Sequence, residues 1–175
     1  MDKSINLVAH EWIKGLVNAD SIVIDATVGN GKDTSFLSNI CHTVYAFDIQ
    51  PQAIQNSKEL NSHANNIIYI CDSHEYITKY VCELVDLIVF NLGYLPGGNH
   101  EITTTSSSTK KALHESAKVL KDNGSIIITC YTGHPGGFKE YQTVMKEIKN
   151  SNYKIIAIYQ YQNIENPPIL IHISK

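Results

Sequence analysis

The segment from Ser21 to Thr34 limits the possible folds more than any other part of this chain. An apolar, β-branched run, Ser21-Ile-Val-Ile-Asp25, leads through Ala-Thr-Val-Gly-Asn-Gly31 into residues 33–40, whose spacing predicts a helix. Glycines at such a strand-to-helix turn allow the backbone to turn sharply and approach a ligand without a Cβ in the way. Position 34 is a threonine, so the third glycine of the GxGxxG dinucleotide pattern is missing. We therefore expect an open α/β fold that binds a nucleoside-containing ligand other than NAD.

The rest of the chain continues the alternation of short apolar runs with helical segments, which is typical of a parallel sheet covered by helices. Further strands are expected at 43–48, 66–72, 85–91 and 125–131, and helices at 5–17, from Pro51 onward, from the Thr/Ser run up to Gly124, and at 138–149. Two closing strands, 154–161 and 169–174, are separated by a joint too short for a crossover helix, so they should form an antiparallel hairpin. This is the plan of a class I methyltransferase: a single domain, residues 1–175, with a Rossmann-like seven-stranded sheet.

Composition excludes several classes of protein. A chain of 175 residues with 43% hydrophobic and 18% charged residues can form one ordinary globular domain, and no apolar run is long enough to cross a bilayer. Four cysteines without a CxxC pair predict buried thiols in a reducing, cytoplasmic compartment and no metal site. All fourteen basic residues are lysines, so an RNA partner would be held by lysines, backbone amides and shape rather than by arginine forks.

Three aspartates end successive predicted strands. These are Asp25, Asp48 and Asp72, and the carboxyl ends of parallel strands meet at the edge where open sheets bind ligands. One such aspartate is explained by helix capping, whereas three favour a ligand site. Asp48 stands where a ribose-binding carboxylate is expected, and Asp72 where methyltransferases usually contact the adenine amino group. We therefore expect S-adenosyl-L-methionine as the cofactor.

The end of the predicted fourth strand, Asn91-Leu-Gly-Tyr94, occupies the place of the (Asn/Asp)-Pro-Pro-Tyr tetrad of amino-group methyltransferases. The Asn91 side-chain oxygen and the Leu92 carbonyl can accept hydrogen bonds from an amine and so direct its lone pair to the methyl carbon, while Tyr94 can stack on a base or face the sulfonium. Leu-Gly in place of Pro-Pro leaves room for an aliphatic amine, or is simply a glycine turn closing the strand. Because such an amine is mostly protonated, we expect acceptors with little excess negative charge.

Two further loops are expected to cover the site. One follows the fourth strand and contains His100, and the other follows the fifth strand and contains His134. Either histidine could remove a proton or contact phosphate, or only hydrogen-bond within its loop. The run from Thr103 to Thr109 predicts a hinge and a helix N-cap, and Asn166-Pro-Pro168 belongs to the terminal joint rather than to the site.

With these blocks in view, the sequence resembles the MnmM-type methyltransferases over nearly its whole length. These are similar to YtqB proteins of low-GC bacteria and are often called rRNA methylases. The residues that carry the resemblance are Asp25-Ala-Thr-Val-Gly-Asn-Gly-Lys-Asp-Thr34, Phe47-Asp-Ile-Gln50, the more specific Asn91-Leu-Gly-Tyr-Leu-Pro-Gly-Gly98, and His134-Pro-Gly-Gly137. Asn99 departs from a position expected to be acidic in many relatives.

The resemblance implies N-methylation of the aminomethyl group on the wobble uridine of tRNA, recognition of an anticodon stem-loop, and a homodimer. It implies catalytic roles for Asn91, Leu92 and Tyr94. Expected cofactor contacts are Asp25, Thr27, Gly29, Asn30, Gly31, Asp33, Thr34, Asp48, Ile49, Gln50, Asp72, Ser73, His74, Asn91 and Gly93. Expected substrate contacts are Tyr94, Pro96, Gly97, Gly98, His100, His134 and Gly136.

Two other readings stay open at this level. A methyltransferase acting on rRNA bases or on a small-molecule amine would have the same cofactor site with a different rim. A non-catalytic α/β binding module, or a nucleotide-dependent oxidoreductase, would share only the glycine turn.

Overall fold

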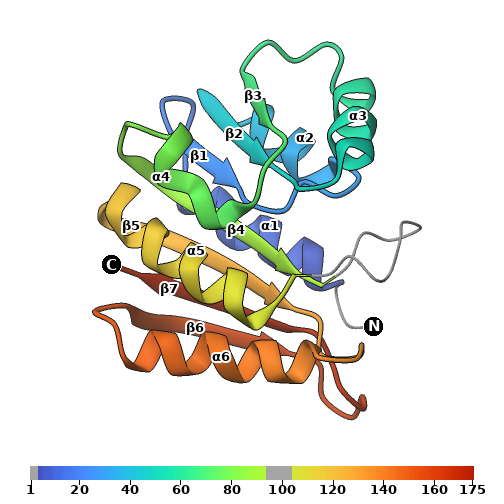
Figure 1. The fold of residues 1–175 in the computed structure, drawn as a ribbon, viewed down its shortest axis with the longest axis vertical. Helices are drawn as coiled ribbons and strands as arrows, with labels where there is room; N and C mark the ends of the chain where they lie inside the picture. Colours follow the sequence, from blue (N-terminus) through green and yellow to red (C-terminus); the bar gives the residue numbers. More distant parts are fainter. Residues whose placement is uncertain (1–3, 94–103) are drawn as a thin grey trace.

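The computed structural model describes residues 4–93 and 104–175, which form one seven-stranded sheet with helices on both faces (Figure 1). The strands are β1 (Ile22–Asp25), β2 (Thr43–Phe47), β3 (Ile67–Ile70), β4 (Val85–Leu92), β5 (Leu120–Cys130), β6 (Lys154–Gln160) and β7 (Ile169–Ser174). The helices are α1 (Ile5–Lys14), α2 (Lys32–Ser38), α3 (Pro51–Leu60), the 3-10 turn η1 (His74–Tyr76), α4 (Ile77–Tyr80), α5 (Ser106–Val119) and α6 (Gly137–Lys149).

The strand order is β3-β2-β1-β4-β5-β7-β6, with the first five strands parallel and β7 antiparallel to both of its neighbours. The order reverses at β1, since β2 lies on one side of it and β4 on the other. Open α/β sheets bind ligands outside the carboxyl ends of the strands at such a switch point. The predicted Rossmann-like sheet with a C-terminal antiparallel hairpin is confirmed.

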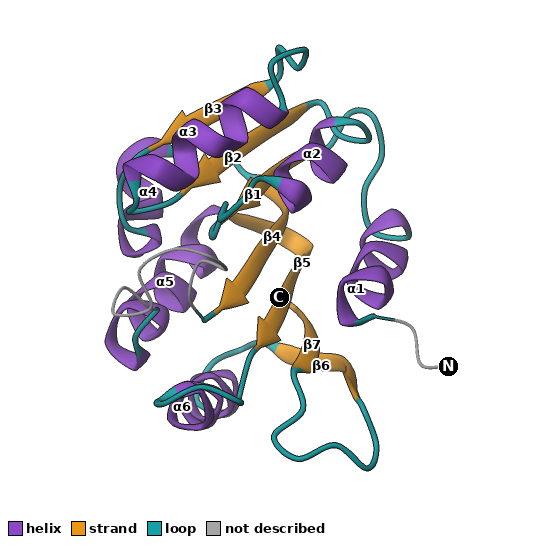
Figure 2. Ribbon diagram, turned by 90° about the vertical axis from the view of Figure 1, so that its right-hand side faces the viewer, coloured by secondary structure: helices purple, strands orange, loops and turns teal. Residues whose placement is uncertain are grey.

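The central strands are buried on both faces, and their side chains alternate between two cores. In β4, Leu87 and Val89 pack with α1 and α2, whereas Ile88 and Phe90 pack with α4, α5 and α6. Figure 2 shows α1 on one side of the sheet and α5 and α6 on the other. This burial explains why these strands read as continuous apolar runs rather than as an alternating pattern.

Several predicted boundaries are wrong. The helix expected to run to Gly124 ends at Val119, and β5 begins at once: Leu120 pairs with Val85, and residues 121–124 bulge before pairing resumes at Ser125. A Cβ on Gly124 would lie 2.7 Å from the Leu120 side chain, so this glycine serves close packing rather than a helix cap.

Smaller differences lie elsewhere in the chain. α1 ends at Lys14 rather than residue 17, and η1 and α4 were not predicted. Cys41 and Cys130 are buried as expected, but Cys71 and Cys82 are exposed, and all four are free thiols. Within the described ranges, no helix has the length and apolar character needed to cross a membrane.

Candidate functional site

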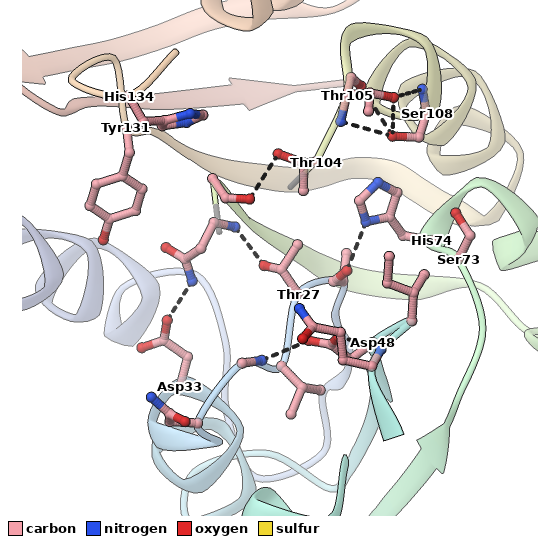
Figure 3. Close-up of a pocket in the computed structure, with 18 of the residues that line it drawn as sticks. Thr27, Asp33, Asp48, Ser73, His74, Thr104, Thr105, Ser108, Tyr131 and His134 are labelled. Atoms are coloured by element: carbon pink, nitrogen blue, oxygen red, sulfur yellow. Dashed lines mark hydrogen bonds between the residues drawn. The ribbon is translucent and has the colours of Figure 1, made fainter. Parts of the chain in front are cut away.

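A cavity of about 910 Å³ lies at the carboxyl ends of the parallel strands, within the size range of small-molecule sites (Figure 3). Its walls come from the loops after β1, β2, β3, β4 and β5, from the start of α5, and from the joint between β6 and β7. The predicted site residues that line it are Thr27, Gly29, Asn30, Asp33, Asp48, Ile49, Gln50, Asp72, Ser73, His74, Asn91, Gly93 and His134.

Other predicted site residues do not line this cavity. They are Asp25, Gly31, Thr34, Leu92 and Gly136. Leu92 is a buried core residue, and Gly136, with a positive φ of 88°, precedes α6 as its N-cap. Predictions for Tyr94, Pro96, Gly97, Gly98 and His100 lie outside the described residues.

Asp25 is fully buried beneath the glycine turn. Its carboxyl group bonds the Thr34 hydroxyl at 2.6 Å and accepts from the Thr27 N–H at 3.2 Å. Burial, together with a smaller contribution from the nearby Asp33 carboxylate, raises the pKa of this carboxyl to about 7 against the opposing hydrogen bonds. Asp25 therefore fastens the start of α2 to the end of β1.

The two glycines of the turn have different tasks. Gly29, with φ 54°, donates its N–H to the Asp48 carboxylate at 2.9 Å and faces the cavity. Gly31, with φ 79°, lies against α3, where an added Cβ would be 2.7 Å from the Ser57 Cα. Gly29 thus shapes the ligand side of the turn, and Gly31 allows α2 and α3 to pack.

Asp48 presents a carboxylate to the cavity from the end of β2. It accepts backbone hydrogen bonds from Gly29 and Gln50, both at 2.9 Å, which fix the direction of its two oxygens. Burial raises its pKa, and these two bonds oppose the rise. A carboxylate held in this way retains lone pairs for the hydroxyl groups of a ligand.

The loop after β3 brings one half-buried and one buried polar group, Asp72 and His74, to the same wall. The Asp72 carboxylate bonds the Tyr80 hydroxyl at 2.6 Å, which lowers its pKa. His74 is buried, and its Nδ1 donates to the Ala26 carbonyl at 2.9 Å, because a carbonyl can only accept. Burial lowers the pKa of His74, so the ring is neutral and its Nε2 is an acceptor, which has no hydrogen-bond partner among the described residues.

Asn91 is fastened at both its backbone and its side chain. Its N–H donates to the Thr27 hydroxyl at 2.7 Å, and its Nδ2 donates to the Asp33 Oδ2 at 2.6 Å. The dashed line that reaches Asp33 in Figure 3 marks the second bond. The amide oxygen of Asn91 is thereby turned away from Asp33 and stays an available acceptor, while its predicted role toward an amine stays a prediction.

The loop after β5 contributes His134 and Tyr131. His134 Nδ1 donates to the Pro135 carbonyl at 3.1 Å, so part of its bonding is within its own loop. Burial raises the pKa of Tyr131 to about 12, and its hydroxyl donates to Asn6 in α1 at 3.2 Å. Gly137 leaves room for the His134 ring, because a Cβ there would lie 2.9 Å from the His134 Nε2.

Sequence reasoning missed several lining residues. They are Asn6, Ala26, Val28, Lys32, Glu75, Thr104, Thr105, Ser107, Ser108, Tyr131, Thr132, Gly133, Asn166 and Pro168. The Asn166-Pro-Pro168 segment was assigned to the terminal joint, which is correct, but the joint reaches the cavity because Thr132 donates to the Pro167 carbonyl at 2.8 Å. The predicted N-cap is confirmed at Thr105, which forms a capping box with Ser108 beside the cavity.

The charge of the lining differs from the expectation of little excess negative charge. The described lining residues include four acidic side chains and one lysine: Asp33, Asp48, Asp72, Glu75 and Lys32. An acidic wall attracts cationic ligands, and it also favours the protonated form of an amine. Within the described ranges, no group of histidine, cysteine and acidic side chains could hold a metal ion.

Comparison with known proteins shows the family to which this chain belongs. The model of a family described as "Putative rRNA methylase" matches residues 44–174. The chain belongs to this family. The fold is that of class I methyltransferases, as the sequence predicted, and the family match confirms the resemblance to the MnmM-type methyltransferases.

Relatives with this fold align along nearly the whole chain. A "putative rRNA-methylase" from Clostridium thermocellum is 33% identical, with a TM-score of 0.93 and coverage of 99% of this chain and 98% of that one. A "putative methyltransferase" from Streptococcus mutans, solved in complex with SAH, is 35% identical, with a TM-score of 0.89 and 99% coverage of both chains.

A curated relative has a more specific name. The "tRNA (mnm(5)s(2)U34)-methyltransferase, chloroplastic" of Arabidopsis thaliana is 37% identical in an alignment 160 positions long that covers 81% of this chain. The matched part is 58% of that protein, so this chain spans a little over half the length of that relative.

Proposed function

We propose that this chain is an S-adenosyl-L-methionine-dependent N-methyltransferase that converts the 5-aminomethyl group of the wobble uridine in tRNA to methylaminomethyl. The observation that carries the proposal is the Asn91 carboxamide. Its nitrogen is bound to Asp33, which leaves its oxygen as an acceptor at the end of a central strand in the cavity wall. An amine that donates an N–H to this oxygen can direct its lone pair toward the methyl carbon, as in-line transfer requires.

The cavity offers groups that fit the cofactor. Asp48 can accept from ribose hydroxyls, and the Nε2 of His74 is a buried acceptor suited to an N–H of the adenine edge. The acidic lining complements a sulfonium. When bound, the cofactor supplies an electrophilic methyl group, and the SAH complex of the Streptococcus mutans relative supports this assignment.

The amine must lose a proton before or during transfer. His134 lines the cavity, and because its Nδ1 donates to Pro135, the Nε2 of its neutral form carries a lone pair. We assign proton removal to this nitrogen and stacking on the base to Tyr94. The choice of a tRNA aminomethyl group, rather than an rRNA base or a small amine, rests on the named activity of the Arabidopsis thaliana relative.

The experiment that tests the proposal is methylation of tRNA by the purified chain. The substrate is tRNA from a strain that lacks this enzyme, and the product nucleosides are resolved by mass spectrometry. We expect aminomethyl-uridine to be replaced by methylaminomethyl-uridine. Cofactor-dependent methylation of rRNA, with tRNA unchanged, would replace this proposal by the rRNA alternative.

We also propose that the chain works as a cytoplasmic homodimer bound to the anticodon stem-loop. The edge strand β6 exposes Ile155, Ile156 and Ile158, each between 44% and 55% exposed, and a second copy would cover them. The free thiols are consistent with a reducing compartment. Sedimentation of Ile156→Lys and Ile158→Lys variants tests the dimer, since charge at this surface is expected to shift the protein toward the monomer.

A further inference from the structure

A chain of hydrogen bonds leads from the cavity wall to helix α1. The Asp33 carboxylate bonds Asn91 through Oδ2 and the His10 Nε2 through Oδ1, both at 2.6 Å. His10 does not line the cavity, and none of the expected site residues lies in α1. Its partner Asp33 is thus held from two sides by residues 58 positions and 23 positions away in sequence.

The directions of these bonds follow from the chemistry of the groups. An ionised carboxylate only accepts, so both the Asn91 Nδ2 and the His10 Nε2 donate to Asp33. His10 can donate in its neutral Nε2–H form or as imidazolium, so the arrangement does not depend on its charge. With one oxygen bonded on each side, the carboxylate plane is fixed, and a flipped Asn91 amide would bring oxygen against oxygen.

His10 is itself held in place by packing. Its ring stacks on Phe36 with centroids 3.8 Å apart and planes 5° from parallel. Phe36 follows Asp33 by one helical turn in α2, so α2 presents both the ring and the carboxylate to His10. The side chains of His10 and Asp33 are only 23% and 20% exposed, which limits competition from water.

We propose that His10 is a positioning residue for methyl transfer, acting through Asp33 to keep the Asn91 carboxamide oxygen turned toward the acceptor amine. This inference rests on the proposed function, since it assigns the same site a support that the activity requires. Without the His10 bond, the Asp33 carboxylate can rotate, and the Asn91 amide loses the contact that fixes its orientation. Misorientation of a group that contacts the substrate lowers the rate of the chemical step more than it lowers binding.

Two substitutions separate the hydrogen bond from the packing. His10→Phe keeps an aromatic ring for Phe36 and removes the donor, whereas His10→Gln removes the ring and can place an N–H near the position of Nε2. In metal sites, loss of the partner that orients a ligand typically costs on the order of 10- to 100-fold, and we take the lower end of that range for His10 by analogy. We therefore expect His10→Phe to lower the single-turnover rate of tRNA methylation about tenfold. We expect His10→Gln to keep most of the rate of the unsubstituted chain.

S-adenosylhomocysteine binding by calorimetry provides the matched control. We expect any loss of S-adenosylhomocysteine affinity in the two His10 variants to stay well below the loss of rate, because His10 itself does not line the cavity and acts only through Asp33. An unchanged rate in His10→Phe would overturn the proposal. So would a rate loss matched by an equal loss of affinity, or a His10→Gln variant as slow as His10→Phe.

A readout without catalysis keeps this inference separate from the proposed function. In a chain labelled with ¹⁵N-asparagine, the Asn91 side-chain amide signal is identified by its loss in Asn91→Asp. We expect its hydrogen exchange to accelerate in His10→Phe and to stay slow in His10→Gln. If the unsubstituted chain methylates no tRNA, the proposed function fails while this measurement still decides the role of His10. Equal exchange in all three proteins would overturn it.

Discussion

Asp25 and Asp48 lie at the ends of adjacent parallel strands, yet their surroundings give the two carboxylates different roles. Asp25 is fully buried, bonds Thr34 and Thr27, and does not line the cavity. Asp48 lines the cavity and accepts from two backbone N–H groups that leave lone pairs for a ligand. The same residue type at the same kind of position therefore supports the loop in one case and faces the ligand in the other. Position at a strand end identifies a candidate, and the neighbouring donors decide its role.

Removing the Asp48 carboxylate gives the largest expected loss of cofactor affinity. A hydrogen bond to a charged group contributes about 1.5–3 kcal/mol, so Asp48→Ala is expected to raise the dissociation constant of S-adenosylhomocysteine about 10- to 100-fold. Calorimetry measures this change, with Asp48→Asn as the control that keeps the volume and one acceptor. A change below about threefold would show that Asp48 resembles Asp25 in having a purely structural role.

Asp72 is expected to give a smaller loss. Its half-buried carboxylate already bonds Tyr80 and Lys79, and water competes for the remaining lone pairs. We expect Asp72→Ala to weaken S-adenosylhomocysteine about fivefold, the size of one ordinary hydrogen bond. The Tyr80→Phe variant, which removes one of these bonds and keeps the carboxylate, is the matched comparison. A loss of affinity as large as that of Asp48→Ala would show that the Asp72 carboxylate bonds the ligand as strongly as the Asp48 carboxylate does.

Asp25→Asn is expected to change affinity least and to change pH dependence most. The pKa of Asp25 is about 7 in the fold, against an ordinary value of 3.8. Below pH 4 both the folded and the unfolded chain carry the proton, and between pH 4 and 7 only the folded chain does. The free energy of unfolding therefore falls as pH rises through this window, by up to about 1.4 kcal/mol per pH unit.

The asparagine variant mimics the protonated carboxyl group and removes this contribution. Urea unfolding at pH 5, 6 and 7 measures the free energy of unfolding of the unsubstituted chain and of Asp25→Asn. We expect the free energy of the unsubstituted chain, relative to that of the variant, to be highest at pH 5 and to fall toward pH 7. A difference that does not vary with pH would mean that Asp25 is ionised throughout this range.

The sequence predicted most of the fold because the central strands and helices carry local signals. Apolar runs bounded by glycine, proline and aspartate located all seven strands, and the short joint after residue 161 predicted the antiparallel pair. The end of α5 was missed because Gly124 has the appearance of a cap, while its actual role depends on contact with Leu120. That contact lies in the bulge that β5 makes where it pairs with β4.

The site was predicted in part for a related reason. Residues at or just after the end of a strand, such as Asn91 and Asp48, were found because parallel strands bring their carboxyl ends to one edge of the sheet. Asn6 and Asn166 carry no such signal, since they enter the wall from elements at opposite ends of the chain. The different roles of Gly29 and Gly31 also depend on tertiary neighbours, Asp48 for one and Ser57 for the other.

The wall of the cavity joins residues as distant in sequence as Asn6 and Pro168. A ligand in it is retained only while α1 and the joint after β6 both stay in place, so it stabilises both against local unfolding. At a concentration one hundred times its dissociation constant, a ligand adds about 2.7 kcal/mol to the free energy of unfolding. Resistance of both regions to proteolysis is thus expected to rise and fall together with the concentration of cofactor.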